Sequence, residues 1–232
     1  MTNYNKVFSV KIYNLYYWFQ RIMAWFTYKV IFDTTIEGQE NIDFSKTFII
    51  IANHNSYIDP PLVGYAVPKP IAYMAKSDLF KVPVLNKIMY WSGAYAIDRK
   101  NRDMSFINNT VYALEHGWLV TIFPEGGRSL DGRMMAVKSG AARILVNHNV
   151  PILPVALLNT NKAWGKKQKF KFRTKMQVKI GKLIYPEEYL PKTEMPEAEK
   201  IEYIRMVYAS KLNEILSDEQ KSLSPDFMDK IS

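Results

Sequence analysis

The stretch from Phe48 to Pro61, FIIIANHNSYIDPP, decides how this chain folds. Four apolar residues in succession, three of them β-branched, predict a strand that is buried on both faces. A polar cluster that contains His54 and Asp59 follows the strand directly. In α/β proteins the strand is a rigid support and ligands bind at its carboxyl end. We therefore expect functional side chains in this cluster.

Asp59 has two compatible interpretations. Asp59-Pro60-Pro61 restarts the chain as a helix, because aspartate is a favourable N-cap and proline is tolerated at the first helical position. A carboxylate can also orient the ring of His54 as a general base. On an ideal helix the two side chains would lie about 140° apart, so they meet only if the chain turns non-helically before Pro60. A cap at Asp59 predicts that turn.

Length and composition narrow the class of protein. The 232 residues suit one domain of ordinary size with a substantial core. The chain has no cysteine, which excludes a disulfide and a thiolate nucleophile and agrees with a reducing compartment. A net charge of +9 predicts an anionic partner, which is nucleic acid, a membrane surface or a phosphorylated substrate.

The amino-terminal segment favours a membrane surface. Residues 7–32 are aromatic and aliphatic but carry interrupting charges, so no run approaches the roughly 18 uncharged residues of a transmembrane helix. There is no signal-peptide cleavage site. On one helix, basic and polar residues share a stripe with two tryptophans, as in interfacial helices: Lys11, Asn14, Trp18, Arg21, Trp25 and Lys29. We expect a membrane-association segment at 1–34 and the main folded domain at 35–232. The alternative is a terminal helix packed on the domain's own core.

Strands and helices are expected to alternate along the rest of the chain. Short apolar runs predict strands at 35–40, 71–75, 94–97, 118–123 and 152–158. Apolar spacing and end signals predict helices at 61–67, 77–91, 104–116, 139–146 and 194–216, with Pro83 bending or dividing the second. This order predicts an α/β fold with a mostly parallel mixed sheet flanked by helices.

Residues 169–180 alternate between basic and apolar side chains, which predicts a strand with one basic and one apolar face. Two interpretations stay open, namely an edge strand protected by lysines and a dedicated binding surface.

Two further strand ends carry polar groups, Arg99 after 94–97 and Glu125 to Ser129 after 118–123. Gly126 and Gly127 permit close backbone approach, and exposed amides beside the guanidinium of Arg128 would suit a phosphate or an oxyanion. The alternative is a tight turn with a surface arginine. The glycine-rich nucleotide loops and the serine nucleophile elbow are missing from the sequence. The other histidines lack metal-ligand spacing, and no metal site is predicted.

Four blocks of the sequence resemble the glycerolipid acyltransferase family, which includes the bacterial 1-acylglycerol-3-phosphate acyltransferases. Residues 53–59 resemble its His-x4-Asp motif, and 93–99, 123–129 and 150–155 resemble its second to fourth blocks in the same order. The third block departs from the commonest form, which has threonine where this chain has Gly127.

The resemblance implies acyl transfer without a cofactor. A fatty acyl group would pass from acyl-ACP or acyl-CoA to the sn-2 hydroxyl of 1-acylglycerol 3-phosphate and give phosphatidic acid. His54 would take the hydroxyl proton and Asp59 would hold its ring. The substrate-binding residues would be Arg99, Glu125, Gly126, Gly127 and Arg128, with Lys138 as a further candidate.

The implied partners are a lysophospholipid, the acyl donor and an anionic membrane surface, without nucleic acid. The implied location is the cytoplasmic face of a membrane. Within the same class, the acceptor could instead be glycerol 3-phosphate or another lysophospholipid. A different class is a non-enzymatic basic protein that binds membrane or nucleic acid through residues 169–182 and the amino-terminal helix, but this hypothesis leaves the four blocks unexplained.

Overall fold

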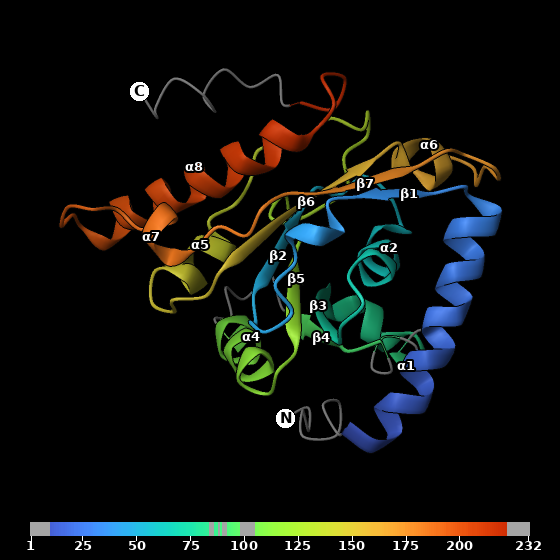
Figure 1. Ribbon diagram of the computed structural model, residues 1–232, viewed down its shortest axis with the longest axis horizontal. Coiled ribbons are helices and arrows are strands. Elements are labelled where there is room, and N and C mark those ends of the chain that lie inside the picture. Colours follow the sequence, from blue (N-terminus) through green and yellow to red (C-terminus); the bar gives the residue numbers. More distant parts are fainter. Residues whose placement is uncertain (1–9, 84–85, 88, 90–91, 98–104, 222–232) are drawn as a thin grey trace.

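The computed structural model describes residues 10–83, 86–87, 89, 92–97 and 105–221, and it contains a twisted sheet with helices on both faces (Figure 1). Arg99 lies outside the described residues. The strands are β1 (Thr35–Glu37), β2 (Ile49–Ala52), β3 (Ile71–Lys76), β4 (Ala94–Ile97), β5 (Leu119–Ile122), β6 (Ile152–Leu158) and β7 (Gln177–Ile180).

The sheet has the order β1-β7-β6-β2-β5-β3-β4, and every neighbouring pair is parallel except β6 with β7. The carboxyl ends of β2, β5, β3 and β4 therefore lie along one edge of the sheet. This arrangement confirms the α/β fold with a mostly parallel mixed sheet.

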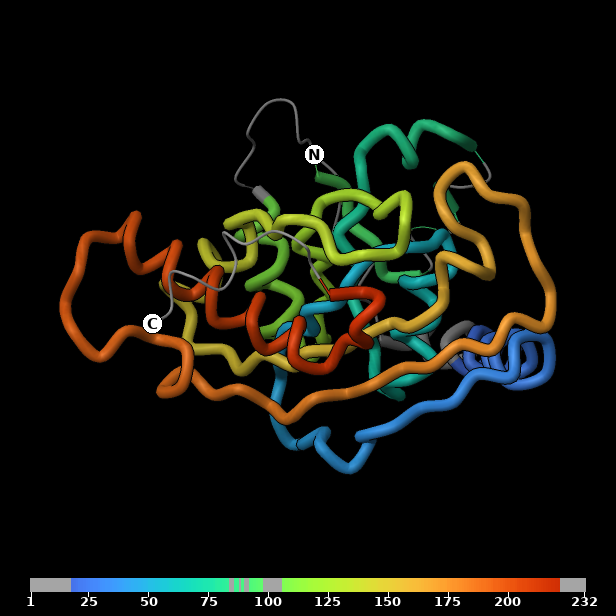
Figure 2. The backbone as a smooth tube through the Cα atoms, turned by 90° about the horizontal axis from the view of Figure 1, so that it is seen from above, coloured from blue at the N-terminus to red at the C-terminus, as the bar shows by residue number. Residues whose placement is uncertain are grey.

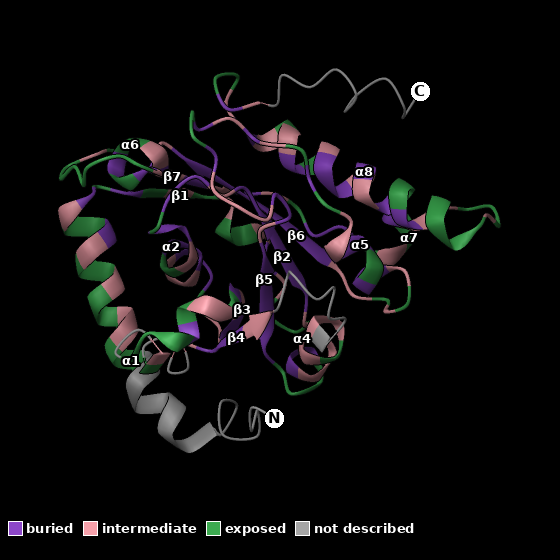
Figure 3. Ribbon diagram, turned by 180° about the vertical axis from the view of Figure 1, so that it is seen from behind, coloured by how far each residue is buried: buried purple, intermediate pink, exposed green. Residues whose placement is uncertain are grey.

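Both faces of β2 are buried, which explains its uninterrupted apolar sequence. Ile49 and Ile51 belong to one core cluster, and Ile50 and Ala52 belong to the cluster on the opposite face. Since side chains alternate along a strand, each face needs its own apolar residues. Figure 3 shows the central strands buried along their length.

Helices supply the outer layers. One face is covered by α2 (Asp59–Ala66) and by the end of the amino-terminal helix, which comprises α1 (Val10–Trp25) and the π-helix η2 (Phe26–Ile31). The other face is covered by α4 (Ser105–Glu115), α5 (Gly140–Leu145) and α8 (Glu197–Ile215). The shorter helices include η3 (Gln39–Asn41), η4 (Ser77–Lys81), α6 (Thr160–Trp164) and α7 (Pro186–Tyr189).

Two expectations for residues 169–180 need correction. The strand expected at 169–180 begins only at Gln177, and the alternation before it belongs to an irregular loop. The edge-strand interpretation of this segment is wrong, because β7 pairs with β6 on one side and with β1 on the other. The helix expected over 77–91 is divided as Pro83 allows, because a 3-10 helix spans Ser77–Lys81 and the described residues Pro83, Asn86, Lys87 and Met89 are again helical. A strand period in the sequence does not distinguish a strand from a loop whose aromatic side chains are exposed.

The amino-terminal helix exposes a row of large apolar side chains. Their exposed fractions run from 48% to 64%, and the residues are Trp18, Phe19, Ile22, Met23, Trp25, Phe26 and Val30. Arg21 instead turns toward the protein and donates to the carbonyl of Gly64 in α2. Within the described residues, every helix is too short or too polar to pass through a bilayer.

Candidate active site

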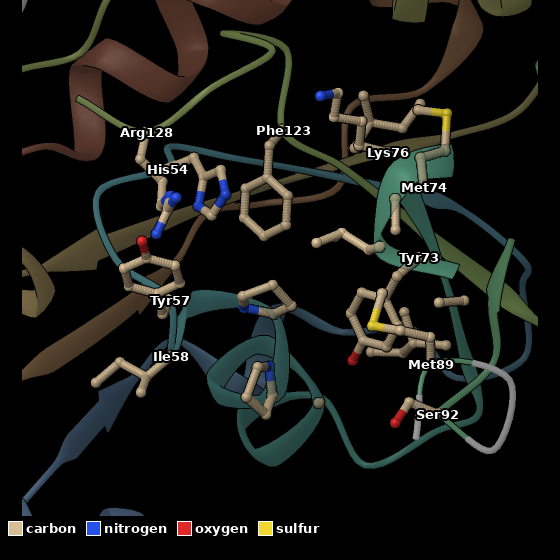
Figure 4. Close-up of a pocket in the computed structure, with 18 of the residues that line it drawn as sticks. His54, Tyr57, Ile58, Tyr73, Met74, Lys76, Met89, Ser92, Phe123 and Arg128 are labelled. Carbon is tan, nitrogen blue, oxygen red and sulfur yellow. The ribbon is translucent and has the colours of Figure 1, made fainter. Parts of the chain in front are cut away.

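The loops after β2 and β5 meet at the edge of a large cavity of about 1770 Å³. His54 and Tyr57 line it from the first loop, and Arg128 lines it from the second (Figure 4). The cavity continues between α1, α2 and β3, where its lining is mostly apolar. Because β2 and β5 are adjacent and parallel, their polar ends are brought together as the strand pattern predicted.

Two contacts hold the side chain of His54. Its Nδ1 lies 2.9 Å from Oδ2 of Asp59, and its ring stacks on Phe123 with 4.3 Å between ring centroids. The side chain is 18% exposed, while that of Asp59 is fully buried. Because a carboxylate accepts hydrogen bonds, Nδ1 carries the proton and donates it in the bond to Asp59; Nε2 of the neutral ring is then unprotonated and can act as a base toward the cavity.

Asp59 does not cap the helix that it begins. Its Oδ2 also accepts the backbone amides of Asn55 and Ser56, each at 2.6 Å, and α2 has no side-chain cap at its start. The carboxylate therefore points back into the preceding turn rather than forward along α2. The expected N-cap is wrong, and the non-helical turn comes instead from these amide bonds.

Tyr28 of η2 joins the amino-terminal helix to this turn. Its hydroxyl donates to the carbonyl of Ile58 at 2.8 Å, and the ring is buried. Burial raises the pKa of Tyr28 well above its usual range, and the nearby charge of Asp59 raises it further. The hydroxyl thus stays neutral and acts as a fixed donor that anchors the helix to the turn between β2 and α2.

Glu125 connects the two loops from inside the protein. Its Oε1 accepts the amide of His54 at 2.6 Å, and its Oε2 accepts the amide of Met135 at 2.8 Å. The side chain is 3% exposed and does not line the cavity. Burial raises the pKa of Glu125 to about 7, although both amide bonds act in the opposite direction.

The two adjacent glycines differ. Gly126 has a φ of +69°, and its amide donates to the carbonyl of Phe123 within a turn. A side chain at Gly126 would contact Lys138, whereas one at Gly127 would meet nothing within 4 Å. The loop is tied to the first one because the amide of Ser129 donates to the carbonyl of His54 at 2.9 Å. Of the two glycines, only Gly126 requires the left-handed backbone.

Arg128 lies over the face of Tyr57, with 3.4 Å between its guanidinium carbon and the ring centroid. Its Nη1 is buried and has no hydrogen-bond partner within the described residues. The guanidinium carries several donors that a phosphate can accept in pairs. Figure 4 shows it between the rings of His54 and Tyr57.

Lys138 contacts the same loop through both its backbone and its side chain. Its amide donates to the carbonyl of Pro124, and its carbonyl accepts the hydroxyl of Tyr208 in α8. The side chain lines the cavity beside Gly126. The structure thus places His54, Gly126, Gly127, Arg128 and Lys138 around one cavity, with Asp59 and Glu125 behind it.

Three contributing residues were not singled out from the sequence. Phe123 supports the ring of His54, and Tyr57 supports Arg128. Asn53 ties the end of β2 to β6, because its amide group donates to and accepts from the backbone of Leu157. All three lie within the blocks at 53–59 and 123–129, so position beside a polar residue was the available signal. Among the described residues, no three metal-ligating side chains come together.

Known proteins share this arrangement of sequence and fold. Residues 33–158 match a family described as Acyltransferase. The 1-acyl-sn-glycerol-3-phosphate acyltransferase of Cocos nucifera is 32% identical over 82% of this chain and 59% of its own length. The protein of that name from Bacillus subtilis is 27% identical over 72% of this chain and 79% of its own.

A solved structure extends the likeness to three dimensions. The crystal structure of the 1-acyl-sn-glycerophosphate (LPA) acyltransferase PlsC from Thermotoga maritima has a TM-score of 0.68 and 26% identity, covering 92% of this chain and 83% of that one. This chain spans about half the length of most curated relatives that it matches. The family match covers more than half of the chain and includes both loops of the site. The chain belongs to the acyltransferase family.

Proposed function

We propose that the protein transfers a fatty acyl group from a thioester, acyl-ACP or acyl-CoA, to the sn-2 hydroxyl of 1-acylglycerol 3-phosphate. The product is phosphatidic acid. The observation that carries the proposal is the contact between His54 and Asp59 at one end of a mostly apolar cavity, beside a guanidinium nitrogen of Arg128 that has no hydrogen-bond partner among the described residues. The names of the relatives agree with this acceptor.

In the proposed reaction, His54 removes the proton of the acceptor hydroxyl as its oxygen attacks the thioester carbonyl. Asp59 holds the ring and stabilises the imidazolium that forms. When the tetrahedral intermediate collapses, the C–S bond breaks and the thiolate takes the proton from His54. The leaving thiol has an intrinsic pKa of about 8.5, so this direct transfer needs no covalent acyl-enzyme.

Arg128 and Lys138 bind the phosphate of the acceptor in this proposal. Arg128 is fixed over Tyr57 and has an unpaired buried nitrogen, so a phosphate that pairs with it removes the cost of leaving that donor unsatisfied. Glu125 acts differently from the substrate contact that the family resemblance implied. Because both of its oxygens accept backbone amides, we assign it the positioning of His54.

The backbone amide of Gly127 is the candidate donor to the oxyanion of the tetrahedral intermediate. The amide of Gly126 is engaged in the turn with Phe123, which leaves the next amide along the loop as the candidate donor. The absence of a side chain at Gly127 leaves open space beside the reacting groups.

The acyl chains would occupy the apolar part of the cavity. Its lining comes from α1, α2 and β3 and includes Phe19, Met23, Pro61, Met74 and Met89. Two residues of this lining, Phe19 and Met23, are also among the exposed apolar residues of the amino-terminal helix. A cavity that opens beside such a row would admit a lipid directly from a membrane surface. We therefore place the protein on a membrane, at its cytoplasmic face.

The test is release of thiol from acyl-ACP and acyl-CoA with a panel of acceptors in liposomes. The panel contains 1-acylglycerol 3-phosphate, glycerol 3-phosphate and lysophosphatidylcholine. We expect the highest kcat/KM with 1-acylglycerol 3-phosphate and formation of phosphatidic acid. Thiol release that is independent of acceptor would contradict the transfer, and preference for the choline lipid would contradict the acceptor.

A further inference from the structure

The loop that connects α6 to β7, residues 165–176, is strongly basic and is called the basic loop here. It contains six Lys and Arg residues and lies in a stretch, 132–186, without any Asp or Glu. The six are Lys166, Lys167, Lys169, Lys171, Arg173 and Lys175. None of them forms an ion pair with another described residue. Since unpaired like charges repel each other, this concentration favours an anionic partner.

Aromatic side chains project from the same loop into solvent. Phe172 is 66% exposed and Phe170 is 40% exposed, next to Trp164 at 38%. Phe170 makes edge contacts with both of the others, with centroids 4.7 Å and 5.5 Å apart. Burial would be expected of such residues in an isolated protein, so this exposed cluster marks an interaction site.

The basic loop continues the exposed apolar surface of the amino-terminal helix. The amide of Arg173 donates to the carbonyl of Ile31 at 3.1 Å, and Phe170 makes an edge contact with Phe32. Figure 2 shows the loop passing beside the end of this helix. The exposed Trp25, Phe26 and Val30 precede that junction, so two segments far apart in sequence form one surface.

The same loop is attached to the site described above. The carbonyl of Trp164 accepts the hydroxyl of Ser56 at 2.7 Å, and the ring of Trp164 lies 5.0 Å from that of Tyr57. The guanidinium of Arg128 in turn lies over the ring of Tyr57. Lys166 lines the cavity itself. An occupant of the basic loop therefore lies next to the cavity that holds the site.

We propose that the basic loop is a second bilayer-docking element, which binds anionic lipid headgroups through its cations and inserts Phe172 at the membrane interface. The aliphatic part of the shared surface favours a bilayer over nucleic acid, because Val30 and Ile22 have no role in phosphate or base contacts but gain from contact with acyl chains. The loop and the amino-terminal helix then orient the cavity toward the lipid phase. This inference is independent of acyl transfer, since it concerns binding to vesicles without substrates.

Vesicle sedimentation of the full chain tests the proposal, with phosphatidylcholine vesicles that contain or lack phosphatidylserine. In one variant, Lys167, Lys169 and Lys171 are changed to Gln, which removes three charges. We expect its partitioning onto phosphatidylserine vesicles to fall about 100-fold, because each cation near an anionic surface contributes roughly fivefold. A matched variant changes three lysines near or in α8, on another side of the molecule, to Gln: Lys192, Lys200 and Lys211. It has the same net charge, and we expect a change below about threefold.

The aromatic part is tested by Phe172→Ser, for which we expect about tenfold weaker partitioning. Tyr203→Ser is the matched control, because Tyr203 is 41% exposed on α8. Equal partitioning of the two triple variants would overturn the proposal, as would unchanged partitioning of Phe172→Ser. Loss of salt-sensitive nucleic-acid binding by the loop variant, with vesicle binding retained, would also overturn it and favour a nucleic acid as the occupant.

Discussion

The two loops of the site differ in how their polar groups are satisfied. In the turn before α2, Asp59 is buried and its Oδ2 accepts three donors from the protein itself. In the loop after β5, Arg128 is supported by an aromatic face but keeps a buried nitrogen without a partner among the described residues. In the first loop, the carboxylate oxygen next to the ring of His54 is held by donors from the protein itself, although Oδ1 of Asp59 has no partner among the described residues. In the second loop, the group without a partner is a cationic donor, which an anion would satisfy.

This difference agrees with the different tasks that we propose for the two loops. Proton transfer needs a base whose orientation does not depend on the substrate, and the bonds around His54 provide it. Recognition of a phosphate gains from donors that only the ligand satisfies. Substitutions in the first loop should therefore affect the chemical step, and substitutions in the second should affect binding of the acceptor.

The largest effect is expected for His54→Ala, which removes the proposed base. General base catalysis contributes typically 10²- to 10⁴-fold, so we expect kcat to fall about 10³-fold. The ring is partly exposed and its loss leaves the bonds of Asp59 to Asn55 and Ser56 in place, so the variant should fold. Thiol release measures kcat, and a thermal melt shows whether the variant is folded. A folded variant with full turnover would remove His54 from the mechanism.

Asp59→Asn separates charge from geometry. Since three donors meet at Oδ2 and Oδ1 is buried without a partner among the described residues, an amide can keep its oxygen at Oδ2 and place its nitrogen at Oδ1. We expect a modest loss of stability, about 1–2 kcal/mol, but a decrease in kcat of about 10²-fold because the imidazolium loses its counter-charge. Unchanged kcat in a folded variant would limit Asp59 to a structural role.

Glu125→Gln tests the buried connection between the loops through pH. The pKa of Glu125 in the folded protein, about 7, lies above its ordinary value of 4.5. Folding therefore favours the protonated acid, and its contribution to stability is present below about pH 4.5 and is lost as pH rises toward and through 7. The difference corresponds to about 3 kcal/mol.

The measurement for Glu125 is the free energy of unfolding of both proteins between pH 4.5 and 8. We expect the Gln variant to gain about 3 kcal/mol relative to the original protein across this range. Exposed carboxylates with lowered pKa values, such as Asp43 and Asp78, titrate in both proteins and cancel in the difference. A difference that does not change with pH would contradict the raised pKa.

Arg128→Ala tests the second loop. Charge-assisted hydrogen bonds to a phosphate contribute about 1.5–3 kcal/mol, so we expect the KM for the acceptor to rise roughly 10- to 100-fold. The KM for the thioester should change less than about twofold. Arg133→Ala is the control, because Arg133 is near in sequence but does not line the cavity. An equal rise in both KM values would contradict the phosphate role.

The sequence was sufficient where local pattern and tertiary structure agree. The apolar run before His54 predicts the buried strand, and two polar strand ends on neighbouring parallel strands predict a shared site. The direction of the Asp59 carboxylate was not predictable, because amides of a turn compete with the helix for it and only the folded turn decides. The family resemblance implies a substrate contact for Glu125, and the burial of its side chain behind the cavity is not visible in the motif.

The basic loop shows the limit of periodicity. Lysine and phenylalanine alternate at 169–172 as in a strand, but both Phe170 and Phe172 are exposed, so this alternation does not separate a core face from a solvent face. Further on, Met176, Val178 and Ile180 are buried and the same period marks a real strand. Period two predicts a strand only where one set of side chains is packed, and packing depends on neighbouring strands.

The smallest effects are expected for the adjacent glycines, which compare two positions within the second loop. Gly126→Ala should lower stability by about 1–2 kcal/mol, because its φ of +69° places a Cβ against the backbone and 2.9 Å from Nζ of Lys138. Gly127→Ala should be neutral or raise stability by up to about 1 kcal/mol, because the space is open and the unfolded chain loses freedom. Thermal or chemical denaturation measures both. Equal destabilisation would show that Gly127 also needs its backbone freedom, and that a threonine there would be excluded by conformation rather than by the chemistry of the site.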